Sequence, residues 1–262
     1  MLTVLQTALE VGLIYGLVAL ALFISFSILN IADLSTDGCF TLGCAVGAML
    51  TIAGHPILAL FAAMAAGMLS GYITAFLQTR LGVESILAGI ISNTGLYTIN
   101  LAVMGFSSNV SITGVDTVFS LFKGLVGGQW SRLILLALIA AVLVLVLIRF
   151  FGTSLGLSIR ATGDSLDMVS ASSINPKATI TIGLCLANAL TALSGCLIGE
   201  YNKFCDINLG TGMVTIALAS LIIGEVFAGR RGSVGIKLPP PLVERHPAPD
   251  AGVAPQSLYS GF

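Results

Sequence analysis

A serine bounded by glycines is one feature of this sequence whose residue types and spacing could support chemistry. Gly152, Ser154 and Gly156 fit the G-x-S-x-G pattern, in which a nucleophilic serine stands on a sharp turn between a strand and a helix. Such a serine needs a histidine base within reach, and the two histidines are His55, far upstream, and His246, near the end. We therefore interpret the match as chance. A hydrolase that uses Ser154 inside a membrane is the least favoured of the three functions considered below.

Two clusters of polar residues within otherwise apolar stretches could instead bind or conduct a solute. Polar side chains are costly inside a bilayer and commonly face a cavity or the interior of a helix bundle. Hydrogen bonding between helices and lining of a substrate path are both open interpretations. The first cluster is Asn30, Asp33, Asp37 and Gly38, and the second is Ser92, Asn93, Thr94, Tyr97 and Asn100.

The sequence lacks motifs for nucleotide, metal or nucleic-acid chemistry. It has no G-x-x-x-x-G-K-[S/T] loop to cradle ATP phosphates, no H-E-x-x-H motif and no C-x-x-C pair. Its net charge of −1 provides no positive field for a nucleic acid. We therefore expect no metal or cofactor in this chain and no nucleic-acid partner, and any ATP-driven work would need another subunit.

The elements that must position these groups are membrane helices. Of 262 residues, 56% are hydrophobic and 9% are charged, against about 25% charged residues in a typical soluble domain. A bilayer core takes about 20 helical residues, and helices satisfy their own backbone hydrogen bonds in lipid. We expect an all-α, polytopic α-helical membrane protein with about seven transmembrane helices in a glycine-rich bundle. The predicted spans are 3–29, 38–53, 57–79, 86–104, 133–150, 178–198 and 212–228.

Glycine spacing predicts close packing within this bundle. Glycines four residues apart let two helix backbones approach each other. The pairs inside spans are Gly12 with Gly16, Gly43 with Gly47, and Gly67 with Gly71. The span at 38–53 is short and follows the first polar cluster, so it could be a half-helix that starts inside the membrane.

The basic residues predict the orientation of the chain in the membrane. Seven spans place the connections alternately on two sides, and cytoplasmic connections carry the excess of lysine and arginine. This puts the N-terminus outside and the C-terminus in the cytoplasm. The cytoplasmic group is Arg80, Arg149, Arg160, Lys177, Arg230, Arg231, Lys237 and Arg245, and the outer group is Lys123, Arg132 and Lys203.

The connection at 151–177 is the longest on the cytoplasmic side, and we expect it to contain a short helix. Asp164 is expected to cap this helix, with Asp167 near the positive end of its dipole. Pro176 then ends the helix or begins the next span. A helix lying on the lipid headgroups and a docking surface for a cytosolic protein are both open interpretations.

The end of the chain differs from the rest in composition. Pro239, Pro240, Pro241 and three further prolines fall within residues 239–262, which are mostly polar. We therefore expect a transmembrane domain at 1–229 and a polar, proline-rich, disordered tail at 230–262.

Three stretches of the sequence resemble permease subunits of ABC importers of the branched-chain amino acid type, and within these the tryptophan/tyrosine type. The stretches are GLIYGLVALALFISFSILNIADLSTDGCFTLGCAVG at 12–47, RATGDSLDMVSASSIN at 160–175 and SGCLIGEYNKFCDINLGTGMVTIALASLIIGEVF at 194–227. The likeness covers residues 5–228, and the GLS-x-RATGD stretch is its most specific part. It implies a multi-pass transporter subunit of the bacterial inner membrane that is not itself an enzyme.

The resemblance also implies partners and roles for particular residues. Such permeases pair with a second permease subunit, here a homodimer, receive an amino-acid-like substrate from an extracellular binding protein, and are driven by cytosolic ATPase subunits that hold ATP and magnesium. The residues implied in coupling to the ATPase are Arg160, Gly163, Asp164, Asp167, Met168, Ala171 and Asn175, and those implied in the substrate pathway are Asn30, Asp33, Asp37, Tyr97 and Asn100.

One departure from the family pattern concerns the C-terminal part. Family members continue beyond the GEVF at 224–227 with further membrane helices, whereas here a polar segment follows, so we expect a truncated or frame-shifted product. The main alternative function is an ion-coupled secondary transporter, which predicts an inverted repeat between the two halves of the chain. No convincing match is visible between 1–104 and 130–228.

Overall fold

The computed structural model describes residues 1–127, 130–171 and 174–228. The expected disordered tail at 230–262, with its four basic residues and its prolines, lies outside the described residues. The longer helices are α1 (Leu2–Leu22), which a π-helix η1 (Phe23–Ile28) extends, α3 (Pro56–Thr79), α4 (Ser85–Val103), α6 (Ser131–Phe151) and α9 (Pro176–Asn202). The shorter helices are α2 (Thr36–Ile52), α5 (Val118–Val126), α7 (Ser154–Asp164), α8 (Leu166–Ala171) and α10 (Met213–Ala228).

A helix lies at each of the seven predicted spans, and the prediction of a polytopic helical membrane protein is confirmed. Among the described residues, five helices are long and apolar enough to cross a membrane, and α2 and α10 are apolar but shorter. The five are Thr3–Ile28, Pro56–Thr79, Ser85–Val103, Ser131–Phe151 and Pro176–Asn202. The predicted boundaries differ from these by a few residues, because hydropathy does not define how the ends of a helix are capped.

The described residues form an all-α protein with one small sheet beside the helices. Two three-residue strands, β1 (Asn109–Ser111) and β2 (Phe204–Asp206), pair in an antiparallel sheet, with Val110 opposite Cys205. Strand β2 lies in the connection between α9 and α10. Strands this short carry no periodic pattern of their own, and they form here because two distant connections lie side by side.

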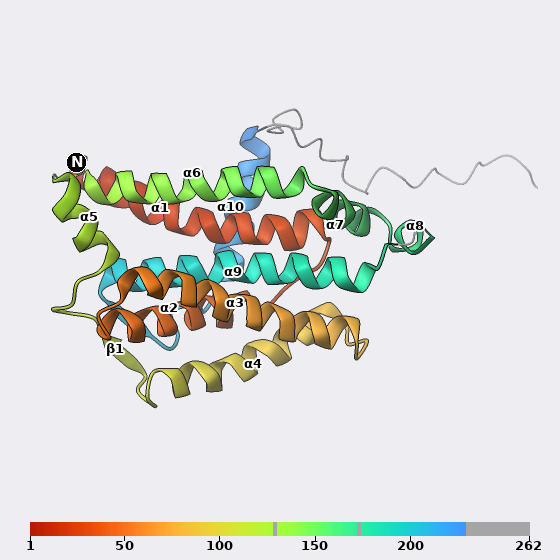
Figure 1. The fold of residues 1–262 in the computed structure, drawn as a ribbon, viewed down its shortest axis with the longest axis horizontal. Coiled ribbons are helices and arrows are strands. Elements are labelled where there is room, and N and C mark those ends of the chain that lie inside the picture. The colour runs from red at the N-terminus through yellow and green to blue at the C-terminus, as the bar shows by residue number, and fades with distance from the viewer. Residues whose placement is uncertain (128–129, 172–173, 229–262) are drawn as a thin grey trace, which may run out of the picture. The chain divides into compact units, whose positions relative to one another are not determined.

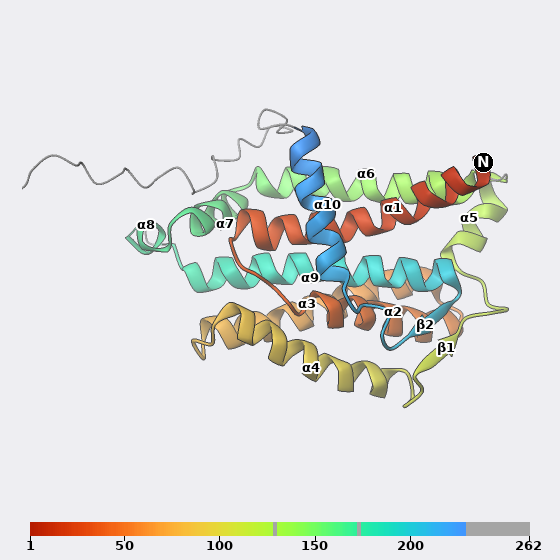
Figure 2. The same cartoon turned by 180° about the vertical axis from the view of Figure 1, so that it is seen from behind.

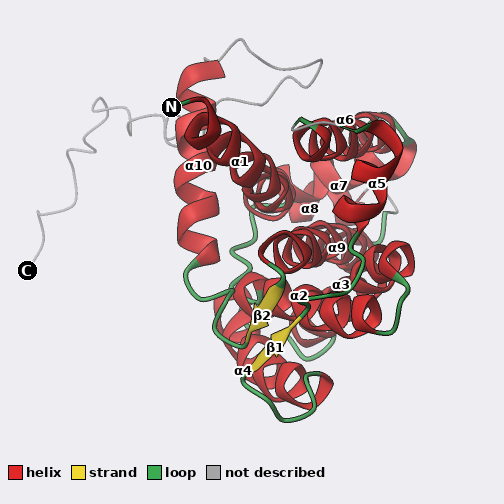
Figure 3. Ribbon diagram, turned by 90° about the vertical axis from the view of Figure 1, so that its left-hand side faces the viewer, coloured by secondary structure: helices red, strands yellow, loops and turns green. Residues whose placement is uncertain are grey.

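The helices of residues 1–221 form one compact unit in which α9 is central. Figure 1 shows α1, α3 and α6 running in one direction and α4 and α9 running back. In the end view of Figure 3, α9 lies among α1, α2, α3 and α6. In the most apolar stretch of 18 residues, 83% of the residues of α9 are buried, against 17% of those of α6. A single helix therefore carries most of the internal contacts, while α6 presents most of its surface to the surroundings.

The described basic residues separate to the two ends of this unit. Helices α7 and α8, the last turns of α3 and α6 and the start of α9 lie at one end (Figures 1 and 2), and with them lie Arg80, Arg149, Arg160 and Lys177. Helix α5, the small sheet and the start of α6 lie at the other end, with Lys123, Arg132 and Lys203. We call these the α7 end and the α5 end.

Close glycine packing joins α2 and α3 to α9. A Cβ atom built on Gly43 would overlap the backbone carbonyl of Ala192, and one built on Gly67 would overlap that of Asn188. Gly47 and Gly71 likewise face α9. The pair at 12 and 16 differs, because a Cβ atom there would meet nothing within 4 Å among the described residues. The predicted packing is thus confirmed for two of the three pairs.

Helix α2 begins partway along the bundle. After η1 the chain leaves the helix at the α7 end, turns back as a non-helical segment at 30–35, and enters α2 beside the middle of α9 (Figure 2). The Sγ atom of Cys39 lies 3.3 Å from the carbonyl oxygen of Asn188, which is near the centre of α9. This geometry agrees with the half-helix that the short span suggested.

The glycine packing generates a stability prediction. Changing Gly43→Leu forces α2 away from α9, and overpacking of this kind typically costs about 1–3 kcal/mol. We expect a lower midpoint of thermal unfolding, followed by circular dichroism in detergent micelles. Gly12→Leu is the matched control, since its side chain enters open space. Equal midpoints for the two variants would contradict the assignment of a close α2–α9 contact.

Candidate functional site

The start of α2 is held by a buried carboxylate. The Oδ1 atom of Asp33 accepts hydrogen bonds from the backbone N–H of Ser35 at 2.9 Å and from its hydroxyl at 2.6 Å. The Oδ2 atom accepts from the side-chain amide of Asn188 on α9 at 2.8 Å. Asp33 is 3% exposed, and these three donors together with the positive end of the α2 dipole stabilise its charge.

A second carboxylate on α2 holds the start of α10. The two oxygens of Asp37 accept hydrogen bonds from the backbone N–H groups of Gly212 at 3.1 Å and Val214 at 2.9 Å. One turn further along α2, the hydroxyl of Thr41 accepts from the N–H of Gly210 at 3.1 Å. The N-termini of α2 and α10, two short helices that begin within the bundle, therefore meet, with Asp33 and Asp37 at their junction. We call this region the half-helix junction.

Helix α4 reaches the same junction through one of its polar residues. The side-chain amide of Asn100 donates to the carbonyl oxygen of Gly38 at 3.0 Å, and Asn100 is 1% exposed. The oxygen of this amide, Oδ1, and the hydroxyl of Ser92 are buried without a hydrogen-bond partner among the described residues. The amide N–H of Asn100 therefore fits the interpretation of this cluster as hydrogen bonding between helices. Two other buried atoms of the cluster, Oδ1 of Asn100 and Oγ of Ser92, do not take part in such a bond among the described residues.

The structure brings together three of the five residues suggested for a substrate pathway. Asp33, Asp37 and Asn100 gather around the start of α2. Asn30 is exposed at a turn with φ of 56°, and Tyr97 is 50% exposed on the outer side of α4. The assignment of these residues to a pathway stays a prediction.

Sequence reasoning missed Asn188, which ties Asp33 to α9. It lies in the middle of the span predicted at 178–198, and it is 1% exposed. An amide at the centre of an apolar span is the same signal that marked Asn100, so the position could have been found. What the sequence could not reveal is that its partner would be an aspartate on another helix.

Buried carboxylates also fasten helices at the α5 end. Glu200 accepts from the hydroxyl of Thr51 at 3.0 Å and from the N–H of Val118, the first residue of α5, at 2.9 Å. Glu10 accepts from the hydroxyl of Tyr201 at 3.0 Å. Glu200 and Tyr201, in the last turn of α9, thus serve internal contacts.

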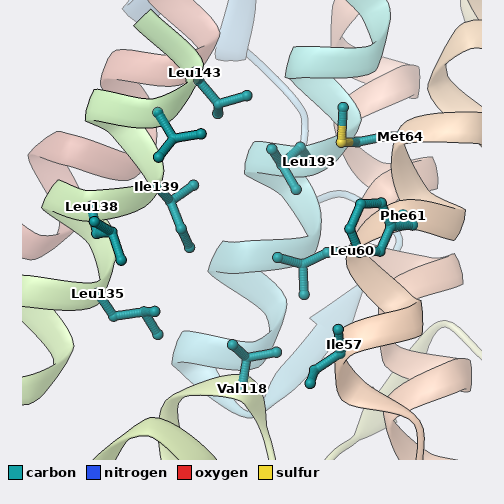
Figure 4. A pocket seen from close by; sticks show the side chains of 11 residues that line it. Ile57, Leu60, Phe61, Met64, Val118, Leu135, Leu138, Ile139, Leu143 and Leu193 are labelled. Atoms are coloured by element: carbon teal, nitrogen blue, oxygen red, sulfur yellow. The ribbon is translucent and has the colours of Figure 1, made fainter. Parts of the chain in front are cut away.

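A groove near the α5 end is lined only by apolar side chains and has a cavity volume of about 340 Å³. Figure 4 shows Ile57, Phe61 and Met64 of α3 on one side of it and Leu138 and Ile139 of α6 on the other. Such a surface offers no hydrogen-bond donor or acceptor side chain for a zwitterion. The groove therefore does not fit the charged ends of an amino acid.

The predicted coupling segment is built from α7 and α8. Helix α7 packs closely on the end of η1, because a Cβ atom on Gly163 would overlap the carbonyl oxygen of Ile28. The hydroxyls of Thr162 and Thr179 lie 2.8 Å apart and join α7 to α9. The guanidinium of Arg160 lies 5.6 Å from the ring centroid of Phe151.

The capping prediction for this segment was partly wrong. Asp164 does not begin a helix but is the last residue of α7, exposed to the surroundings. Asn175 is the residue that caps, since its Oδ1 atom accepts from the N–H of Lys177 at 3.1 Å, and Pro176 begins α9. The side chains of Asp167, Met168 and Ala171 lie outside the described residues.

The G-x-S-x-G match forms no nucleophilic site with a described histidine. Ser154 is the first residue of α7, and Thr153 caps that helix through its hydroxyl, which accepts from the N–H of Gly156 at 3.3 Å. His55 precedes α3 at the α5 end, and His246 lies outside the described residues. The pattern here marks the start of a helix after a helix, not a strand-to-helix turn.

Apolar helices of membrane-spanning length around a polar junction define a multi-pass membrane protein. A comparison with protein families identifies the particular one. The chain belongs to the family described as the branched-chain amino acid transport system permease component, whose model matches residues 4–235. The protein is therefore a transporter component and not an enzyme.

Two relatives cover most of this chain. A tyrosine transport system permease protein of Clostridioides difficile (strain R20291) is 34% identical over 214 residues, which are 81% of this chain and 70% of the relative. An uncharacterized protein, RP368, of Rickettsia prowazekii (strain Madrid E) is 36% identical over 222 residues, which are 85% of this chain and 77% of the relative. No solved structure gives a significant match.

The Asp33–Asn188 contact generates a second prediction. Changing Asn188→Ala removes a donor from a buried carboxylate, and an unsatisfied buried group typically costs about 1–3 kcal/mol, or more when it is charged. We expect a clear fall in the midpoint of thermal unfolding in detergent. Asn202→Ala, at the exposed end of the same helix, should leave the midpoint unchanged. A midpoint for Asn188→Ala equal to that of this control would show that the contact does not stabilise the fold.

Proposed function

We propose that this chain is the membrane-spanning subunit of an ATP-driven importer that moves an amino-acid-like substrate into a bacterial cell. The observation that carries the proposal, beside the family, is the contact between Gly163 of α7 and Ile28 of η1. Residues 29–35 connect η1 directly to α2 and carry Asp33. A push on α7 would therefore act on the segment that leads into the half-helix junction.

In this proposal the chain crosses the membrane seven times, and α2 and α10 are the two short crossings. The α7 end faces the cytoplasm, because Arg80, Arg149, Arg160 and Lys177 lie there and basic residues favour that side. The N-terminus then lies outside. The cell membrane concerned is the bacterial inner membrane.

The cytosolic partner would be a pair of ATPase subunits, which hold the ATP and magnesium that this chain has no motif to bind. Helices α7 and α8 offer them a surface with Leu155 50% exposed, Leu157 66% exposed and Leu166 52% exposed. Asp164 lies at the end of α7, on the same surface. Closure of the ATPase dimer would shift α7 and switch the bundle between two packed states.

The remaining partners follow from the same proposal. An extracellular binding protein would deliver substrate to the α5 end, and a second copy of the permease would complete the transporter in the lipid bilayer. Tyrosine is the substrate to test first, because a relative covering 81% of this chain is named for tyrosine transport.

An ion-coupled secondary transporter is the second candidate, and one observation favours it. Secondary transporters often place their sites where helices begin or end inside the membrane, and α2 and α10 begin within the bundle with their N-termini together. The two candidates differ in their energy source, so a single reconstitution can distinguish them.

The proposed function predicts ATP-dependent uptake by the reconstituted chain. We would place the permease in proteoliposomes with a candidate ATPase and a candidate binding protein, and follow uptake of radiolabelled tyrosine. We expect uptake that needs internal ATP and is unaffected by an ionophore. Uptake driven by a sodium or proton gradient without ATP would support the second candidate and overturn the first.

A charge reversal at the docking surface tests the coupling end separately. Asp164→Lys should lower uptake and the stimulation of ATP hydrolysis by about tenfold, since a loss of about 1.4 kcal/mol in docking changes an equilibrium constant tenfold. Asp116→Lys makes the same charge change at an exposed residue of the α5 end and should leave hydrolysis unchanged. If Asp164→Lys kept full activity, this surface would not be the one that couples.

A further inference from the structure

Helix α10 has no capping side chain of its own. The residue before its first turn is Gly212, with φ of 83°, and glycine carries no group that can accept from the free N–H groups there. A helix usually meets this need with a serine, threonine, aspartate or asparagine at that position. Here the acceptor comes from Asp37, which is 175 residues away from Gly212 in sequence.

Three hydrogen bonds and one close contact hold the two chain segments together. Both oxygens of Asp37 and the hydroxyl of Thr41 accept backbone N–H groups of the segment at 210–214. A Cβ atom on Gly210 would overlap the carbonyl oxygen of Asp37 and lie 2.6 Å from the hydroxyl oxygen of Thr41. The segment is seated against α2 along its backbone, which leaves no room for a side chain at this position.

The same turn of α2 is fixed on its other side to α9. Asp33 accepts from Asn188, and the thiol of Cys39 lies 3.3 Å from the carbonyl oxygen of the same residue. Helix α2 therefore stands between α9 and the start of α10 and is hydrogen-bonded to both. A relative movement of α2 and α10 would have to break the bonds to Asp37 and expose charged and polar groups inside an apolar bundle.

We propose that Asp37 is a positioning residue for transport. It latches the N-terminus of α10 to α2, so that the starts of both helices move as one unit when the permease changes state. This inference rests on the proposed function for its role in transport. Asp37 in this role does not contact the substrate. Both of its oxygens are already occupied by the backbone of another helix.

The first test measures the latch without any transport. In the full chain in lipid nanodiscs, Asp37→Asn keeps the size of the side chain but offers one oxygen in place of two, and Asp37→Ala offers none. We expect amide hydrogen exchange in the peptide around 212–214 to become about tenfold faster in both variants, because the first turn of α10 opens more often. Unchanged exchange there would overturn the proposal.

Asp206→Asn is the matched control for this test. Its carboxylate also accepts a backbone N–H, that of Asn208 at 2.8 Å, in the same connection but within one exposed turn. Its exchange at 212–214 should equal that of the wild type. Thr41→Val is a milder second variant if the Asp37 variants do not fold, and it should speed exchange at Gly210.

The second test separates a latch from a substrate contact and from a purely structural role. In the reconstituted transporter, Asp37→Asn should lower the maximal uptake rate about tenfold while KM changes by less than about twofold, and Asp37→Glu should restore part of the rate. A raised KM with an unchanged maximal rate would mean that Asp37 binds substrate. Faster exchange with both kinetic parameters unchanged would mean that the latch stabilises the fold only, and either result would overturn the proposal.

Failure of the proposed function would give a different result. Wild-type uptake that is driven by an ion gradient and needs no ATP would overturn the ATP-driven importer. The latch would still be tested in that case, because exchange rates need no partner and the same division between maximal rate and KM can be measured on ion-driven uptake.

Discussion

The requirement that every backbone N–H and C=O inside an apolar bundle find a partner is the constraint on which this structure depends. A continuous helix meets the requirement by itself, but α2 and α10 begin within the bundle and expose free N–H groups there. Asp33 accepts one N–H at the start of α2, that of Ser35, and Asp37 accepts two at the start of α10, those of Gly212 and Val214. Asp33 can be buried, and Asp37 partly buried, in this apolar chain because each carboxylate meets donors that would otherwise be unpaired.

The central position of α9 follows from the same constraint combined with glycine packing. Hydrogen bonds between helices require close backbones, and Gly43 of α2 and Gly67 of α3 allow that approach to α9. Asn188 then lies near enough to donate to Asp33. Packing and polar contacts therefore depend on each other here, since neither the small residues nor the hydrogen bonds alone would place α2 beside the middle of α9.

The α7 end is connected to the half-helix junction by a short series of contacts. Gly163 meets Ile28, the chain then passes through 29–35, and Asp33 stands at the end of that segment beside α2. The π-helix at 23–28 lies in this series, and such segments are often found at functional sites. These contacts join α7 to the junction through one continuous stretch of chain, and the proposed coupling would use them.

The sequence by itself determined the membrane class, the places of seven apolar helices and the two groups into which the described basic residues fall, because hydropathy, helix length and charge are local properties of the chain. It also marked Asp33, Asp37 and Asn100 as polar groups in apolar surroundings. Only the tertiary structure decided that Asp37 caps α10, that Asn188 serves Asp33, that Tyr97 faces outward, and that Asp164 ends a helix instead of starting one. These outcomes depend on which segments lie side by side, and a hydrogen-bond partner more than 150 residues away leaves no pattern in the local sequence.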